Sequence, residues 1–399
     1  MPLSSPAHVI TSDAEAIETA AALGASFAHG SVARDAGRIL PHAELDELSG
    51  SGLLGITVPR AYGGAEVSAR TLGEVVRLLS AGDSSIGQIP QNHFFFVEVL
   101  KENGTPEQRE FFAAELLAGK RFGNALAEKG ATHALEFATR LVPHPDGGYL
   151  LTGTKNYATG ALFAHWIPVF ARGEEDRITA AFLPRDAPGL TVVDDWDGIG
   201  QRTTASGTVL LDGVRVAADR VVPHHLTFER PEVFGAFGQF IHAAVDTGIA
   251  RAALEEGGEL VRTLARPWGE AGVERANDEP DVIQKYGELA LLVRSAEALL
   301  AHAGDAVDAA RARPGDPSAA AEASLAVAAA RAQADTAALT VAGEVFALIG
   351  ARSALRSQGL DRHWRNARTH TLHDPRRWKV RHLGNHALNG VTPPANGIV

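Results

Sequence analysis

The sequence contains no cysteine, and this absence excludes several kinds of chemistry at once. Disulfide bonds, thiolate metal sites, iron–sulfur clusters and a cysteine nucleophile all require that residue. The sequence also has neither a GxGxxG motif after a strand nor a GxxxxGK[ST] motif. Recognition of phosphate groups by a dinucleotide-binding loop or a Walker loop is therefore not expected.

An excess of positive charge is missing as well. The chain carries 37 Lys and Arg residues against 48 Asp and Glu residues, a formal net charge of −11, and it has no strongly basic block. Proteins that bind nucleic acid or a membrane surface usually show the opposite balance. We therefore expect no nucleic-acid partner and no membrane partner.

Long apolar runs are also absent. The first residues lack the basic and apolar regions of a signal peptide. Arg331 and Asp335 interrupt the alanine-rich stretch towards the C-terminal end, so no run reaches the roughly 18 apolar residues that a membrane span needs. We predict a cytoplasmic protein. Its 399 residues are enough for two or three packed units.

The first part of the chain, up to about residue 120, has the spacing of helices. Ser12 and Asp13 can cap a helix whose apolar side includes Ile17 and Leu23. Thr105, followed by proline and then by Gln108, is a strong helix-start signal, because the threonine and glutamine can form a capping box.

Between about residues 121 and 228 the pattern changes to β. Short β-rich runs such as Trp166–Phe170 and Ile178–Leu183 follow one another without intervening helices, which favours an antiparallel sheet or a small barrel. Helical spacing then returns. Ser318–Ile349 is predicted to be an alanine-rich helix, whose small side chains permit close packing in a bundle.

A dense group of titratable residues lies near the C-terminal end. The ten residues His370–Lys379 include two histidines, one carboxylate, three cations and a tryptophan. Each buried charge needs a partner, so this segment is poor material for a core. It is suited to the wall of a cleft that binds anions or transfers protons, although a solvated polar face is the plain alternative.

Four motifs carry a family resemblance. Gly104–Arg109, Gly153–Thr159, Asp195–Ser206 and Arg365–Asp374 occur in this order, and together they resemble segments of the acyl-CoA dehydrogenase family over almost the whole chain. The resemblance implies a homotetramer, a dimer of dimers. It also implies an α+β, mostly α fold of three parts: an N-terminal helical domain (residues 1–120), a middle antiparallel β domain (121–228) and a C-terminal four-helix bundle (229–399).

Departures from the dehydrogenase pattern favour an oxygenase. Asp374 stands where dehydrogenases have their glutamate base. Phe346–Gly350 replaces their double-glycine segment, and side chains there crowd the approach to an adenine dinucleotide, so FMN is expected rather than FAD. Gln91–Phe94, Phe122–Ala125 and Thr204–Gly207 resemble the dibenzothiophene monooxygenases and the sulfur-acquisition oxidoreductases, most closely the latter.

The resemblance implies a two-component FMNH2-dependent monooxygenase that serves sulfur acquisition. A separate NAD(P)H:flavin reductase supplies FMNH2, which reacts with O2 to a flavin C4a-hydroperoxide that oxygenates a small organosulfur compound. In such enzymes the cofactor performs the difficult step, while the protein provides position and electrostatics.

Three residues are candidates for catalysis. His93 and His373 are acid–base candidates, because imidazole titrates close to neutral pH. Asn124 is expected to orient the oxygen that is transferred. Ordinary roles compete with these interpretations, since a lone histidine on a helix or a buried asparagine is often structural.

Six residues are candidates for binding the cofactor. By match to the family, Tyr157 and Thr159 lie along the flavin ring, and Trp196 shields it from solvent unless it belongs to the core. Arg266 matches an arginine that binds a flavin phosphate, usually across a subunit interface, and a guanidinium suits that contact through paired donors. A polar insertion, 269–280, follows it. The remaining two candidates are Ser206 and Lys379.

Two other functions stay open from the sequence. One is an FAD-dependent acyl-CoA dehydrogenase-type oxidoreductase with Asp374 as its base, and the other is a non-catalytic scaffold of the same fold. A metal site is not predicted. His382 and His386 have the spacing of a helical metal pair, but they lack the glutamate of HExxH and an evident third ligand.

Overall fold

The computed structural model describes residues 6–130 and 136–394. Its N-terminal part consists of helices, as predicted. Ser12 Oγ accepts a hydrogen bond from the backbone N–H of Glu15, and Thr105 and Gln108 form the expected capping box. The helices are α1 (Asp13–Ala28), α2 (Ser31–Gly37), α3 (His42–Gly50), α4 (Ala69–Gly82), α5 (Ser84–Gln88), α6 (Gln91–Asn103) and α7 (Pro106–Leu117).

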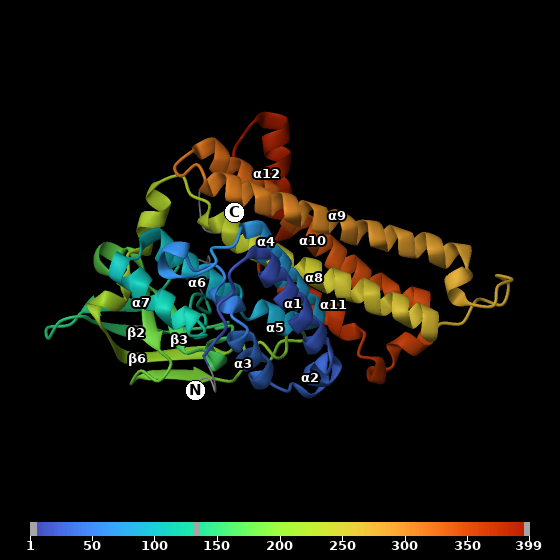
Figure 1. The fold of residues 1–399 in the computed structure, drawn as a ribbon, viewed down its shortest axis with the longest axis horizontal. Coiled ribbons are helices and arrows are strands. Elements are labelled where there is room, and N and C mark those ends of the chain that lie inside the picture. Colours follow the sequence, from blue (N-terminus) through green and yellow to red (C-terminus); the bar gives the residue numbers. More distant parts are fainter. Residues whose placement is uncertain (1–5, 131–135, 395–399) are drawn as a thin grey trace.

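The middle part is one sheet of seven strands in the order β5-β6-β2-β1-β3-β4-β7. Strands β2, β3 and β6 are labelled at the lower left of Figure 1. Every strand pair is antiparallel except β1 and β3, which run parallel. The strands are β1 (Arg140–Pro143), β2 (Tyr149–Lys155), β3 (Trp166–Arg172), β4 (Ile178–Pro184), β5 (Leu190–Val193), β6 (Thr208–Val216) and β7 (Val221–Val222).

The parallel pair corrects the predicted antiparallel sheet, because the sheet is mixed. Strand β2 turns back on β1 and also pairs with β6, so both of its edges are occupied. The chain then crosses through residues 156–165 and enters β3 beside the other edge of β1, in the same direction as β1. Alternation of apolar and polar residues does not distinguish these two directions of pairing.

The C-terminal part is a helical bundle, in agreement with the prediction. Helix α10 packs most extensively against α8 and α9, and α11 packs against both α8 and α10. Helix α12 projects from the bundle at the top of Figure 1. The helices are α8 (Phe234–Thr263), α9 (Pro280–Arg311), α10 (Pro317–Ile349), α11 (Asp361–His370) and α12 (Arg376–Asn389).

Helix α10 shows how a long apolar helix is used as a core element. By length and composition, it is the one helix in the described residues that could cross a membrane, a finding that the two interrupting charges did not lead us to expect. In the structure it lies in the bundle between α8 and α9, and most of its buried side chains are alanines. Arg331, one of the two charges, pairs there with Asp246 of α8.

The loop before strand β6 is fixed against helix α11. The backbone N–H of Gln201 donates to Asn366 Oδ1 at 2.6 Å. A Cβ at Gly200 would lie 2.0 Å from the backbone oxygen of Arg365, so only glycine allows this approach. The contact joins the middle part to the bundle beside the cavity described next.

Candidate active site

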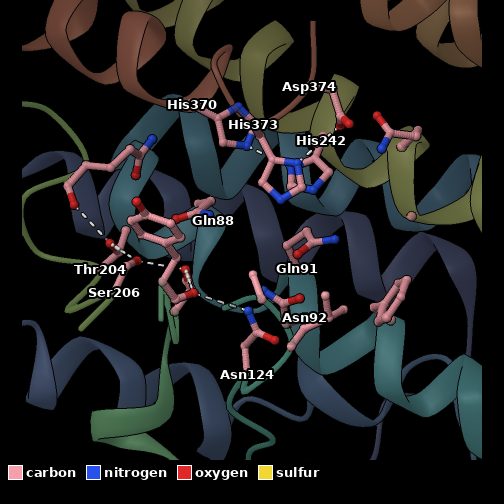
Figure 2. Close-up of a pocket in the computed structure, with 18 of the residues that line it drawn as sticks. Gln88, Gln91, Asn92, Asn124, Thr204, Ser206, His242, His370, His373 and Asp374 are labelled. Carbon is pink, nitrogen blue, oxygen red and sulfur yellow. Dashed lines mark hydrogen bonds and ion pairs between the residues drawn. The ribbon is translucent and has the colours of Figure 1, made fainter. Parts of the chain in front are cut away.

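A cavity of about 620 Å³ lies where the helical and β parts meet. Its walls come from α5 and α6, from loops at one end of the sheet, from α8, and from the end of α11 with the turn that follows (Figure 2). Two faces differ in character, one carrying hydroxyl and amide groups and the other carrying aromatic rings.

The hydroxyl groups form a connected row on the polar face. Thr159 Oγ1 and Ser206 Oγ are 2.7 Å apart, and Ser206 Oγ and Thr204 Oγ1 are also 2.7 Å apart. Thr204 Oγ1 donates to the backbone oxygen of Gln201 at 2.9 Å, which fixes the end of the row. A row of hydroxyls can both donate and accept hydrogen bonds, so it suits a ligand edge that carries both kinds of group.

Unpaired amide oxygens lie around the same cavity. Asn124 Nδ2 donates to the backbone oxygen of Tyr157 at 3.3 Å, while its Oδ1 is buried without a partner. Gln88 Oε1 and Gln239 Oε1 are likewise buried and unpaired. Buried polar atoms are nearly always hydrogen-bonded, so these acceptors indicate the place of a ligand that brings donors.

Tyr157 and Trp196 stand at the mouth of the polar face. Their rings meet edge to face, with centroids 6.3 Å apart, and Trp196 Nε1 donates to the backbone oxygen of Gln201 at 2.8 Å. Tyr157 has a positive φ of 59° and is 52% exposed in the single chain. The pair is positioned to limit the access of solvent to the cavity.

Aromatic side chains form the other face. The ring centroids of Phe95 and Phe234 are 4.5 Å apart, and His224 stacks on Phe170 with centroids 4.6 Å apart. Burial lowers the pKa of His224 to about 3, so this imidazole is neutral. Within the described chain, no lysine or arginine lines the cavity, and Asp374 is its one acidic residue.

A buried row of polar residues reaches the cavity from the bundle. His370 Nδ1 lies 2.6 Å from Asp246 Oδ1, and His370 Nε2 lies 3.0 Å from His242 Nδ1. Arg331 Nη1 donates to the other oxygen of Asp246. Burial lowers the pKa of both histidines. Burial opposes the ionised form of Asp246, but His370 and Arg331 outweigh it and hold the pKa of this carboxyl below its usual value.

Comparison with known proteins decides the family. Three profiles match in chain order: "Acyl-CoA dehydrogenase, N-terminal domain" over residues 16–120, "middle domain" over 124–214 and "C-terminal domain" over 240–376. A dibenzothiophene monooxygenase from Rhodococcus erythropolis is 35% identical over 404 residues, covering 96% of this chain and 95% of the relative. The chain belongs to the acyl-CoA dehydrogenase family, in its branch of flavin-dependent monooxygenases.

Further relatives of this chain agree with its assignment to the flavin-dependent monooxygenases. The probable FMNH2-dependent monooxygenase SfnC from Pseudomonas putida is 31% identical and covers 97% of this chain and 98% of the relative. FMN-bound TdsC from Paenibacillus superposes with a TM-score of 0.91 at 32% identity, covering 96% and 100% of the two chains. The methanesulfinate monooxygenase MsuC from Pseudomonas fluorescens has a TM-score of 0.89 at 30% identity, covering 96% and 99%.

Six of the predicted site residues lie at the cavity of the monooxygenase. Asn124, Tyr157, Thr159, Trp196, Ser206 and His373 all line it. His373 is half exposed; its Nδ1 lies 3.1 Å from Asp374 Oδ2. Burial opposes the charge of Asp374, but the hydrogen bond and charge of His373, with Lys379 and Arg331, hold the pKa of Asp374 far below its usual value.

His93 lies outside the cavity lining, contrary to the catalytic interpretation. Its Nε2 lies 2.8 Å from the backbone oxygen of Leu54, and its Nδ1 accepts from the backbone N–H of Phe122 at 3.1 Å. Burial lowers the pKa of His93 to about 4. The neutral ring therefore joins two backbone segments, while its neighbours Gln91 and Asn92 reach the cavity.

Two further candidates are also away from the cavity in a single chain. Arg266 is exposed and belongs to the segment that joins α8 to α9. Figure 1 shows this segment at the right-hand tip of the bundle. Lys379 is buried in α12; burial lowers its pKa, and the nearby Asp374 opposes that shift. His382 and His386 lie on α12 as well. The described residues contain no group of three or more His, Cys, Asp or Glu placed to hold a metal ion.

Sequence reasoning missed His242 and Asp246, which the structure brings together with His370. The two residues are one helical turn apart on α8, within a stripe that reads as apolar. Two polar residues four positions apart on one face of an otherwise buried helix would have been the available signal, because each needs a partner.

Proposed function

We propose that the protein is a two-component monooxygenase that uses FMNH2 and O2 to oxygenate a small organosulfur compound. The observation that carries the proposal is the hydroxyl row of Thr159, Ser206 and Thr204 beside the unpaired oxygens of Asn124 and Gln88. Relatives that match nearly end to end are named as monooxygenases of dibenzothiophene and as a probable FMNH2-dependent monooxygenase.

The residues present fit a flavin. Its pyrimidine edge offers a donor between two carbonyl acceptors, and the cavity offers unpaired acceptors together with hydroxyl donors. Thr159, Ser206 and Tyr157 would hold the ring, with Trp196 at its edge. Arg266 would reach the phosphate from a neighbouring subunit, and Lys379 would add positive charge. When bound, the reduced flavin supplies the electrons that activate O2.

The protein's own groups then have separable tasks. Asn124 holds its side-chain oxygen towards the ligand through the bond of its Nδ2 to the Tyr157 backbone oxygen. Trp196, fixed by the bond of its Nε1 to the backbone oxygen of Gln201, excludes water from the ring. His373, oriented by Asp374, gives or accepts a proton at its free Nε2 as oxygen is transferred.

The substrate is a neutral sulfur compound. The aromatic face formed by Phe95, Phe170, Phe228 and Phe234 suits an apolar molecule, and the neutral His224 adds no charge. An anionic substrate needs a cation to offset its desolvation, and no lysine or arginine of the described chain lines the cavity, where Asp374 is negative. A thioether or a sulfur heterocycle is therefore favoured over a sulfinate.

An acyl-CoA dehydrogenase activity is the second candidate, and the geometry disfavours it. Its base would be Asp374, but a carboxylate whose pKa lies far below the usual value is a weak base at neutral pH. The bond to His373 also occupies one of its oxygens. A butyryl-CoA dehydrogenase from Megasphaera elsdenii shares the fold, with a TM-score of 0.82 at 21% identity.

We also propose a cytoplasmic homotetramer, a dimer of dimers, that works with a separate NAD(P)H:flavin reductase. Large apolar side chains are exposed on α9, α12 and the loop between α8 and α9: Ile283 (57%), Leu291 (68%), Trp268 (71%) and Leu388 (84%). Exposed apolar area of this extent on a bundle supports association. Because Arg266 lies at the bundle tip, a neighbouring subunit is also what would bring it to a flavin.

The function is tested with purified protein, FMN, NADH and a flavin reductase. We expect oxygen from ¹⁸O2 to enter a neutral sulfur substrate, and bound FMN to be weak and extractable. Tightly bound FAD that is reduced by an acyl-CoA would establish the dehydrogenase instead. No affinity for either flavin would establish a scaffold.

A further inference from the structure

A hydrogen-bonded row of three residues runs from the centre of the bundle to the wall of the cavity. It begins at Asp246 on α8, passes through His370 at the end of α11, and returns to His242, one turn before Asp246 on α8. Figure 2 shows the two histidines, His370 and His242, at the cavity wall. The three residues are 0%, 3% and 3% exposed, so water does not compete for these bonds. The proposed roles of His373 and Asn124 do not use this row.

The row fixes which nitrogen of each ring carries hydrogen. Asp246 is ion-paired with Arg331 and has a lowered pKa, so its carboxylate accepts only. His370 must therefore donate from Nδ1 to Asp246, and as a neutral ring it has a bare Nε2. That Nε2 accepts from Nδ1–H of His242. The Nε2 of His242 is then left without hydrogen.

The bare nitrogen of His242 faces the ligand space. His242 lines the cavity, and its Nε2 makes no hydrogen bond with the described residues. We propose that His242 Nε2 is the proton acceptor of this cavity, and that His370 and Asp246 are positioning residues that hold its tautomer. The proposal rests on the proposed function for the reaction it serves, but the tautomer itself belongs to the flavin-free protein.

The overall reaction shows why an acceptor is needed. FMNH2, O2 and a sulfur substrate give FMN, the S-oxygenated product and water, so two electrons and both hydrogens of FMNH2 end in the water molecule. A group of the protein would hold one of these protons until the departing oxygen can take it. His242 Nε2 accepts that proton, and the charge spreads along the row towards Asp246, as an aspartate stabilises an imidazolium in other enzymes. The same nitrogen returns the proton to the departing oxygen.

The surrounding charges set how strongly His242 holds a proton. Burial opposes protonation of His242 most strongly and lowers its pKa, and positive charge on His373, His370, Arg331 and Lys379 acts in the same direction. Two carboxylates act in the opposite direction through its neighbours: Asp246 bonds to His370, which bonds to His242, and Asp374 bonds to His373, whose ring packs on that of His242. His242 is therefore neutral at rest and returns its proton readily.

The substitution His242→Asn distinguishes the roles of the two ring nitrogens of His242. Asparagine Nδ2 can replace the Nδ1–H that donates to His370, but nothing replaces Nε2. We expect unchanged thermal stability and FMN affinity, while oxygenation falls about 10²–10⁴-fold and the consumed oxygen appears as hydrogen peroxide. Full coupling of oxygen uptake to product in this variant would overturn the proposal.

His363→Asn is the matched control. His363 is a buried histidine on the same helix as His370, bonded to Glu256 at 2.8 Å and away from the cavity. We expect it to lower thermal stability and leave coupling intact. Equal uncoupling in this control would overturn the proposal, because any disturbed buried histidine would then suffice.

A measurement without flavin tests the tautomer directly. In protein labelled with ¹⁵N-histidine, the His242 signals are assigned by their loss in His242→Asn, and we expect protonated Nδ1 with bare Nε2. Asp246→Asn should reverse the tautomers of both histidines. The amide of the new side chain donates to His370 Nδ1, so the hydrogen of each ring moves to its Nε2. Protonated Nε2 on His242 in the wild type would overturn the inference, even if Asp246→Asn fails to fold. Absent FMN binding with the expected tautomer would instead refute the proposed function alone.

Discussion

The rings of His242 and His373 lie against each other at the cavity wall, with centroids 4.0 Å apart and planes inclined by 38°. Each ring is held by a carboxylate of its own, His373 directly by Asp374 and His242 through His370 by Asp246. The two imidazoles are therefore oriented by separate carboxylates, so a change at one support leaves the other in place.

Replacing His373 by Ala should abolish oxygenation or divert oxygen to free hydrogen peroxide, while FMN still binds. A positioned acid–base group contributes roughly 10²–10⁴-fold in rate. Product and peroxide are measured together at saturating reductase. Asp374→Asn is the matched variant and should have a smaller effect. If Asp374→Asn is the more damaging change, the dehydrogenase-type role of that carboxylate must be reconsidered.

Replacing Arg266 by Ala should weaken FMN binding without unfolding the protein. The loss of one charge-assisted hydrogen bond costs roughly 1.5–3 kcal/mol, so affinity should fall about ten- to a hundredfold in an FMN titration. Arg262→Ala is the control, because Arg262 is exposed one turn earlier on α8 and pairs with Glu259. Unchanged FMN affinity in Arg266→Ala would show that Arg266 does not contact the flavin phosphate and is an ordinary surface residue.

Replacing Leu291 by Glu should dissociate the proposed tetramer and weaken FMN binding together. A charge at this exposed apolar position prevents its burial between subunits, and the loss of a neighbour removes the Arg266 that it contributes. Light scattering and FMN titration follow the two effects. A wild-type protein that is monomeric at micromolar concentration with intact FMN affinity would contradict both the proposed tetramer and the proposed contribution of Arg266 from a neighbouring subunit.

Stability should fall as the pH drops from about 6.5 towards 4, in part because of His93. Burial lowers its folded pKa to about 4, whereas the unfolded value is 6.5, so below pH 6.5 the unfolded chain binds a proton that the folded protein refuses. The shift corresponds to a loss on the order of 3 kcal/mol by pH 4. The free energies of unfolding of the wild type and of His93→Gln, measured with urea, should converge as the pH falls over this range. A difference between the two free energies that does not change with pH would show that His93 keeps its ordinary pKa.

A neutral sulfur substrate should be oxygenated far more efficiently than an anionic one. Thioethers or thiophene-type compounds can occupy the aromatic face, whereas an alkyl sulfinate must leave water without meeting a lysine or arginine. The comparison is made through kcat/KM with both substrate types. A preference for the sulfinate would place the substrate outside the aromatic face.

Local signals in the sequence predicted local structure well. The capping box of Thr105 and Gln108 lies within four residues and forms as expected. The parallel pairing of β1 with β3 arises instead because β2 already occupies one edge of β1, which leaves the other edge for β3. The alternation of apolar and polar residues does not tell whether two strands pair parallel or antiparallel. His93 shows the same limit, since spacing alone did not tell whether it or its neighbours Gln91 and Asn92 would face the cavity.

The resemblance to the family supplied what residue patterns could not. It pointed to Thr159 and Ser206, which lie 2.7 Å apart at the cavity although 47 positions separate them. It did not point to His242 and Asp246, whose meaning depends on His370 arriving from another helix. Contacts between distant segments decide such sites, and one sequence does not display them.

The cavity takes its walls from α5 and α6, from the sheet loops, from α8 and from the end of α11, so all three parts of the chain contribute to it. Recognition of FMN therefore requires that the last interfaces of the chain have closed, and flavin binding should appear late in refolding, after helix formation. A ligand that binds only the finished structure shifts the folding equilibrium by mass action. The cellular flavin supply would then govern how long newly made chains survive proteolysis.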